Sequence, residues 1–192
     1  MIGKKRMDNL QFCVETVLDE DIPGDFIETG VWRGGSCIFM RALLVAHEVL
    51  DRRVFVADSF RGLPTPGVEQ DSGDVHHTFN SFFGVSREQV EANFRRYDLL
   101  DEQVVFLEGW FKDTLPAAPI SELAVLRLDG DMYGSTMDGL ALYDKLSSGG
   151  FLIIDDYASP GCKQAIDDFR LDRGIAEKMT HIDWTGAFWR KH

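Results

Sequence analysis

Residues 149–161 read GGFLIIDDYASPG, and the apolar run 151–154 leads directly into two adjacent carboxylates, Asp155 and Asp156. The run predicts a buried β-strand, with a glycine pair before it and turn residues after it. Side chains alternate between the two faces of a strand, so neighbouring acids at its end point in different directions unless a polycationic group gathers them. The stretch therefore places two anions at the mouth of a buried strand and calls for a cation beside them.

The rest of the chain alternates between runs of strand length and segments of helical period. Strands are predicted at 25–29, 53–58, 103–109, 123–129 and 150–155, and helices at 7–21, from about 36, and at 86–100, 135–146 and 162–174. This alternation predicts an α/β fold, a doubly wound, mostly parallel sheet with helices on both faces. The stretches 179–183 and 186–191 lie close together and predict a terminal antiparallel hairpin. No linker or repeat divides the chain, so residues 1–192 are expected to form a single domain.

Composition narrows the class of protein. The formal net charge is -12 and the isoelectric point is about 4.7, which disfavours nucleic acid as a partner and favours a small polar or cationic ligand, or one reached through a metal ion. Cys13, Cys37 and Cys162 have no CxxC spacing, as expected of a reduced, cytoplasmic protein. The sequence contains no apolar run of membrane-spanning length and no apolar signal region at its start, so a soluble protein is expected, without a membrane association.

Every predicted parallel strand ends near an acid. The strand ends read Glu28-Thr29-Gly30, Asp58-Ser59, Glu108-Gly109-Trp110, Asp129-Gly130-Asp131 and Asp155-Asp156. In doubly wound sheets, ligands bind beyond the carboxyl ends of the strands, where these residues would gather. The pattern therefore predicts a polar ligand site at this edge of the sheet.

The loop after the first strand reads ETGVWRGGS, with Gly30, Gly34 and Gly35 followed by Ser36. Glycines at such a turn let the backbone approach a ligand closely, although a tight turn without a ligand has the same composition. The spacing G-x-x-x-G-G differs from the dinucleotide fingerprint G-x-G-x-x-G, and Glu28 before the first glycine suits a cationic ligand better than a pyrophosphate.

Asp58 ends the second predicted strand. An acid at this position commonly accepts hydrogen bonds from the two hydroxyls of a ribose, but it can equally form an N-cap or an Asx-turn. Trp110 and Phe111, after the third strand, could stack on a nucleobase or fill the core.

Asp129, Asp155 and Asp156 are the candidate ligands of a metal ion at the ends of two predicted strands. If their strands are neighbours, three carboxylates converge and repel one another unless a cation lies between them. Oxygen-only ligands favour Mg²⁺ or Mn²⁺ over Zn²⁺. The alternative is that each acid caps the helix that follows it.

The segment 60–86 has turn residues, acids and aromatics without a sustained period, and its length predicts a lid or substrate-binding loop. It contains His76 and His77, which are either solvated or available as a general base. Near the other end of the chain, Asp183 could line the site.

Five motifs occur in the order of a known family: PGDFIETGVWRGGS, VADSFRGLP, GWFKDTLP, LAVLRLDGDMYGSTMDGL and GGFLIIDDY. Together they resemble the macrocin/novobiocin-type sugar O-methyltransferases, which are S-adenosylmethionine-dependent, and the similarity covers nearly the whole chain. The resemblance implies a class I methyltransferase (Rossmann-like) fold, with seven strands and an antiparallel terminal strand. It also implies an acceptor that is a hydroxylated small molecule, most often a glycoside of natural-product biosynthesis.

The resemblance assigns roles to the predicted site residues. The ETGVWRGG loop would hold the methionine part of S-adenosylmethionine, with Glu28 and Gly30 closest and with Thr29, Gly34 and Ser36 in the same loop. Asp58 would bind the ribose hydroxyls with Ser59 beside it, and Gly109 and Trp110 would flank the adenine. The magnesium ligands would be Asp129, Asp155 and Asp156, with Asp129 also acting as general base. Apart from the resemblance, a metal-bound carboxylate is a weakened base, so His76 or His77 could take the proton instead.

Relatives in this family have additional N-terminal sequence that helps to cover the cofactor, and MIGKKRMDNLQ resembles an internal family segment. We therefore expect either a shortened chain or a cover supplied by the segment 60–86 or by a second subunit of a homo-oligomer. Alternative functions are catechol-type O-methyl transfer, cofactor binding without catalysis, and nicotinamide-dependent oxidoreduction. The absence of a Tyr-x-x-x-Lys pair and the G-x-x-x-G-G spacing count against the last of these.

Overall fold

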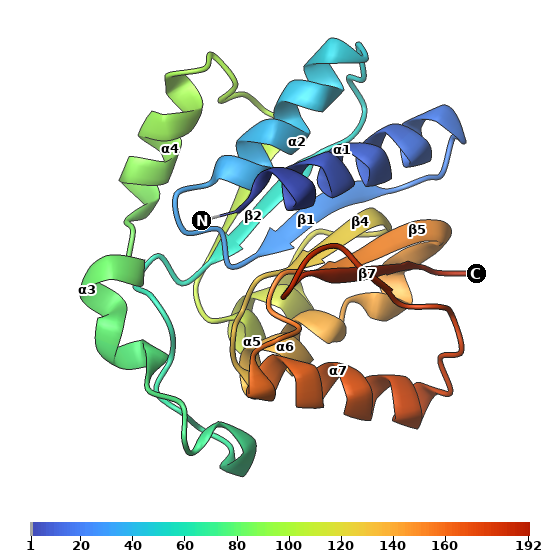
Figure 1. Ribbon diagram of the computed structural model, residues 1–192. Coiled ribbons are helices and arrows are strands. Elements are labelled where there is room, and N and C mark those ends of the chain that lie inside the picture. Colours follow the sequence, from blue (N-terminus) through green and yellow to red (C-terminus); the bar gives the residue numbers. More distant parts are fainter. Residues whose placement is uncertain (1) are drawn as a thin grey trace.

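The chain is built around a seven-stranded sheet with strand order β3-β2-β1-β4-β5-β7-β6, described here for residues 2–192 from a computed structural model (Figure 1). Neighbouring strands from β3 to β5 pair in parallel, whereas β7 pairs antiparallel with both β5 and β6. The strands are β1 Asp25–Thr29, β2 Val54–Asp58, β3 Val104–Glu108, β4 Leu123–Leu128, β5 Leu146–Ile154, β6 Thr180–His181 and β7 Ala187–Arg190. The predicted doubly wound sheet and its terminal hairpin are therefore confirmed.

Helices cover both faces of the sheet (Figure 1). The first face is covered by α1 Lys4–Asp19, α2 Gly35–Ala46 and α4 Arg87–Arg95, and the second by α5 Phe111–Thr114, α6 Tyr133–Leu140 and α7 Pro160–Arg173. Two apolar cores result, one between the sheet and each helix layer. Because side chains alternate along a strand, each central strand supplies both cores, which explains the continuous apolar runs in the sequence.

Several predicted boundaries differ from the observed ones. The helix predicted at 135–146 begins at Tyr133, ends at Leu140 and is followed by a short helical turn, Tyr143–Lys145. The strand predicted at 150–155 begins four positions earlier, at Leu146. At α4 the predicted cap is present, since the Ser86 hydroxyl accepts a hydrogen bond from the Gln89 amide.

The direction of winding reverses between β1 and β4, and this reversal opens a crevice beyond their carboxyl ends. Gly30 lies at this point with φ +88°, and a Cβ at Gly30 would lie 1.9 Å from the Asp129 carbonyl oxygen. Only glycine therefore permits the backbone after β1 to pass so close to the end of β4.

The segment 60–86 lies on the side to which the arrowheads of β1 and β2 point (Figure 1). It contains three short helical pieces, Glu69–Asp71, His76–Phe79 and α3 Asn80–Phe83, which the sequence did not predict. Asn80 fastens the segment to itself, because its side chain exchanges hydrogen bonds with the backbone of Leu63.

Within residues 2–192, every helix is either too short or too polar to cross a membrane. The three cysteines are buried and unpaired.

Candidate functional site

A cavity of about 1230 Å³ lies beyond the carboxyl ends of β1, β2, β4 and β5. Of the predicted cofactor residues, its lining includes Glu28, Gly30, Ser36, Asp58, Ser59, Gly109 and Trp110, and it includes all three predicted metal ligands, Asp129, Asp155 and Asp156. Two predicted cofactor residues are placed elsewhere. Thr29 is buried and faces Gly139 of α6, and Gly34 packs against Val90 of α4.

Asp58 fastens the glycine loop to the end of β2. Its Oδ2 accepts hydrogen bonds from the backbone amides of Val31 (2.8 Å) and Trp32 (3.3 Å), and its Oδ1 accepts one from Phe60 (2.8 Å). The last bond is the Asx-turn that the sequence allowed. Burial raises the pKa of Asp58, while the three amide bonds oppose this rise. The carboxylate therefore shapes the loop and still borders the cavity.

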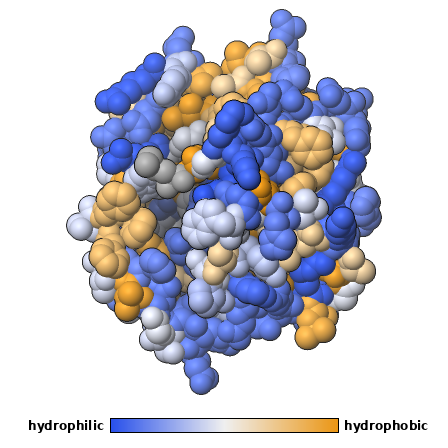
Figure 2. Space-filling view, viewed as in Figure 1, coloured by the Kyte–Doolittle hydropathy of each residue, from blue (hydrophilic) through white to orange (hydrophobic). Residues whose placement is uncertain are grey.

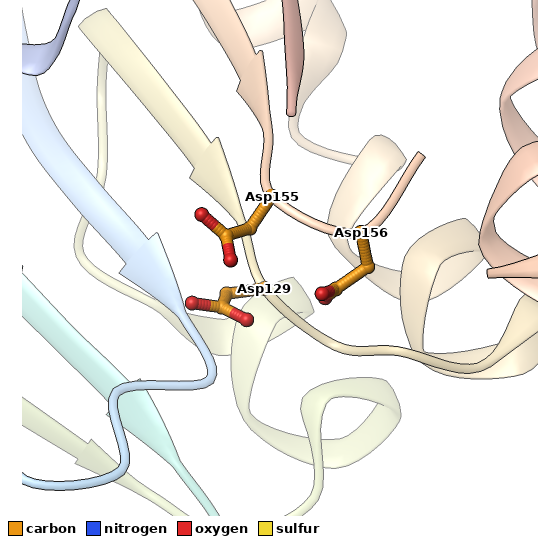
Figure 3. A group of neighbouring side chains, drawn as sticks. All are labelled: Asp129, Asp155 and Asp156. Atoms are coloured by element: carbon orange, nitrogen blue, oxygen red, sulfur yellow. The ribbon is translucent and has the colours of Figure 1, made fainter. Parts of the chain in front are cut away.

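The three aspartates at the ends of β4 and β5, here called the acid trio, point toward one another (Figure 3). Leu128 pairs with Ile154 in the sheet, so the next residues, Asp129 and Asp155, leave it side by side. One ligand oxygen from each of Asp129, Asp155 and Asp156 lies within 4.8 Å of the other two. Such a set of hard oxygen donors suits a divalent cation of the Mg²⁺ type.

Asp156 has the most anionic surroundings of the trio. Burial raises its pKa well above the usual value, and the charges of Asp129, Asp131 and Asp155 raise it further. Among residues 2–192, Asp156 forms no ion pair with a basic side chain. A cation bound by the trio would remove this repulsion, so the residues present fit the metal that the sequence predicted.

Arg127 on β4 is the first of the site residues that sequence reasoning missed. Its side chain is 1% exposed and its guanidinium pairs with Glu28 (2.5 Å), Asp129 (2.7 Å) and Asp155. Burial opposes its charge, but these three carboxylates outweigh that effect and raise the pKa of Arg127 well above its usual value. A charged residue inside the apolar strand LAVLRL was the available signal, because a fully buried arginine requires acidic partners.

Glu28 lies beside Arg127 in the sheet, on the neighbouring strand β1. Its carboxylate accepts hydrogen bonds from Arg127 and from the Cys37 thiol (3.0 Å). Burial raises the pKa of Glu28 to about 7, against the opposing charge of Arg127. Glu28 thus borders the cavity as a buried acid that is already paired.

A second arginine reaches the trio from α1. Arg6 pairs with Asp155 Oδ2 through Nη1 and with Asp183 Oδ2 through Nε, the latter at 3.0 Å. Asp183 in turn accepts hydrogen bonds from the amides of Thr185 and Gly186. Asp183 therefore acts on the site through Arg6, and neither residue's role was evident from the spacing of motifs.

The two predicted histidines are not brought to the trio. His76 pairs with Asp74 on the exposed part of the segment 60–86, and neither His76 nor His77 lines the cavity. The general-base role of either histidine therefore stays a prediction, whereas Asp129 borders the cavity with its side chain 31% exposed.

Aromatic side chains border the cavity where it opens to solvent. Trp32 packs against Phe82 of α3, with ring centroids 5.4 Å apart, and Trp184 is 83% exposed beside Thr185. The face shown in Figure 2 is mainly hydrophilic, but apolar side chains gather over α3 at its left. The mouth of the cavity thus combines acids with exposed apolar surface.

Asp71 anchors the segment 60–86 beside the acids. It is 3% exposed, and its carboxylate accepts hydrogen bonds from the amides of Tyr133 (2.7 Å) and Gly134 (2.9 Å) at the start of α6. An acid at a helix start is favourable in itself, and here it joins two segments that both line the cavity.

Comparison with known sequences places the chain among methyltransferases. The sequence model of a family described as macrocin O-methyltransferase (TylF) matches residues 1–191. A 4'-O-methyltransferase from Streptomyces olivaceus, named for 8-demethyl-8-(2,3-dimethoxy-alpha-L-rhamnosyl)-tetracenomycin C, is 58% identical over 99% of this chain and 74% of its own length. The demethyldecarbamoylnovobiocin O-methyltransferase of Streptomyces niveus is 55% identical over 100% of this chain and 75% of its own length.

Solved structures agree with these sequence matches. The structure of the O-methyltransferase NovP superposes with a TM-score of 0.97 at 54% identity, over 99% of this chain and 81% of that one. A calicheamicin methyltransferase, CalS11, superposes with a TM-score of 0.75 at 21% identity, over 96% of this chain and 78% of that one, and this second likeness shows the fold alone.

Proposed function

Because the chain belongs to the macrocin O-methyltransferase family, we propose that it transfers the methyl group of S-adenosylmethionine to a sugar hydroxyl of a natural-product glycoside, with a divalent cation at the acid trio. The chain is an O-methyltransferase. The observation that supports the finer proposal is the position of the acid trio beside the glycine loop, both bordering one cavity at the reversal point of the sheet.

The cofactor occupies the β1–β2 side of the cavity in this proposal. Asp58 and Ser59 bind the ribose hydroxyls, since they follow β2 and border the cavity. Trp110, after β3, lies against the adenine. Glu28 and Gly30 lie toward the methionine end, where the positive sulfonium is favoured by the acidic surroundings.

The cation is held by oxygens of Asp129, Asp155 and Asp156. When bound, it would polarise the acceptor hydroxyl and lower the pKa of that hydroxyl. The protein positions this chemistry through Arg127, which holds Asp129 and Asp155 in fixed orientations from a buried strand. Three carboxylates favour Mg²⁺ or Mn²⁺ over Zn²⁺.

Methyl transfer forms a bond from the acceptor oxygen to the methyl carbon and breaks the bond from that carbon to sulfur. S-adenosylhomocysteine leaves, and the hydroxyl proton passes to a carboxylate oxygen of Asp129. Asp129 suits this task because it borders the cavity with its side chain 31% exposed, whereas the side chain of Asp155 is 10% exposed. Holding oxygen and methyl carbon in line contributes on the order of 7–11 kcal/mol to such a reaction.

The acceptor enters from the side of Trp184. This indole is exposed next to the turn that holds Asp183, and it borders the same cavity as the acids. An aromatic face beside a polar site suits a sugar ring or an apolar aglycone. It offers a large apolar contact area, and fixing the tryptophan side chain costs little conformational entropy.

Calorimetric titration of S-adenosylhomocysteine, followed by a screen of deoxysugar glycosides and catechols with Mg²⁺ or with a chelator, tests the proposal. We expect binding of S-adenosylhomocysteine, no binding of NADH, and methylation of a glycoside that stops when the chelator removes the metal. Methylation of catechols alone would overturn the sugar acceptor. Unchanged turnover in the chelator would overturn the cation, and failure to bind S-adenosylhomocysteine would overturn the assigned cofactor pocket.

A further inference from the structure

Asp155 differs from the other acids of the trio because both of its oxygens already have cationic partners. Its Oδ1 pairs with Arg127 and its Oδ2 pairs with Arg6. A metal ion that uses Asp155 must therefore share an oxygen with a guanidinium or displace one. The two arginines are not equally able to leave.

Arg127 is fixed. It lies on the central strand β4 with its side chain 1% exposed, and it also pairs with Glu28 and Asp129. Its departure would leave the buried Glu28 without a basic partner and would also remove the ion pair of Asp129, which is strongly unfavourable. Arg127 is therefore a permanent partner of Asp155.

Arg6 can leave Asp155 without losing all of its partners. It lies in the first turn of α1 and borders the cavity, with its side chain 12% exposed. Its Nε also pairs with Asp183 Oδ2 at 3.0 Å. Asp183 is itself held through Oδ1 by two backbone amides, so it remains in place as an alternative anchor.

We propose that Arg6 is an exchangeable counter-ion of the acid trio: a divalent cation displaces Arg6 from Asp155, and Arg6 stays on Asp183. This inference rests on the cation of the proposed function. Arg6 is then a positioning residue: it holds Asp155 in place before the metal binds, and it lowers metal affinity because the metal must displace it. Because Arg6 then has one partner in place of two, metal binding loosens the first turn of α1. By linkage, a ligand that draws Arg6 away from Asp155 strengthens metal binding by the same factor by which bound metal strengthens the binding of that ligand.

Direct measurement of Mn²⁺ binding by electron paramagnetic resonance tests the exchange on the intact chain, without any need for turnover. Removing one positive charge next to the bound cation should tighten binding, so we expect Arg6→Gln to lower the Mn²⁺ dissociation constant about tenfold. Arg6→Lys, which keeps the charge, should stay close to wild type. Lys5→Gln is the matched control, because it removes the same charge from an exposed neighbour and should change the constant less than twofold.

Hydrogen exchange on the wild-type protein is a second measurement, which does not depend on whether Arg6→Gln folds. Hydrogen exchange in wild type should become faster for the peptide that covers residues 3–9 when Mn²⁺ is added, and it should not change in α7. Unchanged exchange at 3–9, or an Arg6→Gln variant that binds Mn²⁺ as weakly as wild type or more weakly, would overturn the exchange and leave the proposed function intact. Failure of wild type itself to bind Mn²⁺ would overturn both, and this result is recognised before any variant is made.

Discussion

The Arg127 guanidinium lies 2.5 Å from the Glu28 carboxylate, and the two residues occupy neighbouring positions on β4 and β1. Both side chains are buried. The same guanidinium holds two acids of the trio, so one side chain joins the proposed cofactor side of the cavity to the proposed metal side. The site is therefore organised around a buried cation that belongs to the protein.

Replacement of Arg127 is expected to destabilise the fold. Arg127→Met leaves three carboxylates without their common partner, and removing one member of a buried ion pair typically costs about 3–5 kcal/mol in free energy of unfolding. Urea unfolding measures the loss. Arg53→Met, at an exposed position, should stay within about 0.5 kcal/mol of wild type, and equal effects of the two changes would contradict the assignment.

Asp156→Asn should separate metal binding from cofactor binding. Losing a direct ligand should weaken Mn²⁺ binding by more than about 10–100-fold, which is the loss typical of a residue that only hydrogen-bonds a ligand. The dissociation constant of S-adenosylhomocysteine should change little. Calorimetry with each ligand measures both. Asp172→Asn on the exposed side of α7 is the control. Retention of full Mn²⁺ affinity in Asp156→Asn would remove Asp156 from the ligand set.

Asp71→Ala should release the segment 60–86 from α6. The change leaves the amides of Tyr133 and Gly134 without an acceptor, at a cost of about 1–3 kcal/mol for a buried group. We expect faster proteolysis within 60–86 and a higher acceptor KM. Asp71→Asn keeps one acceptor oxygen and should fall between wild type and Asp71→Ala. Unchanged proteolysis would show that other contacts hold the segment.

Glu28 makes stability depend on pH in a defined direction. Its pKa is about 7 in the folded chain, above the value of about 4.3 expected when unfolded, so the folded state binds more protons between these values. The contribution of Glu28 is full below about pH 4.3 and is lost as pH rises toward 7. Urea unfolding from pH 5 to 8 should show a decline in stability that is smaller in Glu28→Gln. An equal decline in both proteins would contradict the prediction.

Trp184→Ala should weaken acceptor binding alone. Loss of the exposed indole is expected to raise the acceptor KM about tenfold, since a loss of about 1.4 kcal/mol in binding free energy corresponds to that factor. The affinity for S-adenosylhomocysteine should not change. Leu171→Ala is the matched control, because Leu171 has the same 83% exposure and does not line the cavity. A parallel rise in KM in both variants would exclude a specific contact.

The sequence alone was sufficient for the fold class and for most of the residues assigned to the site, since most of these line the cavity. Apolar runs of strand length separated by helical periods define a parallel sheet, and the acids that end those runs must gather at its carboxyl edge. Asp129, Asp155 and Asp156 were predicted in this way, and the structure places them together. Strand direction and the alternation of side chains along a strand are local properties, so the sequence alone predicts where these acids lie.

Only the tertiary structure decided which cations hold the acids and which candidates stay outside the cavity. Arg127 meets Glu28 across two strands that are 99 positions apart in the chain, and Arg6 meets Asp155 at a separation of 149 positions. Such pairs follow from strand order and helix placement, which no local pattern contains. For the same reason Thr29 and His76 matched the sequence pattern but do not line the cavity, since the face of a strand and the path of a long segment are set by packing.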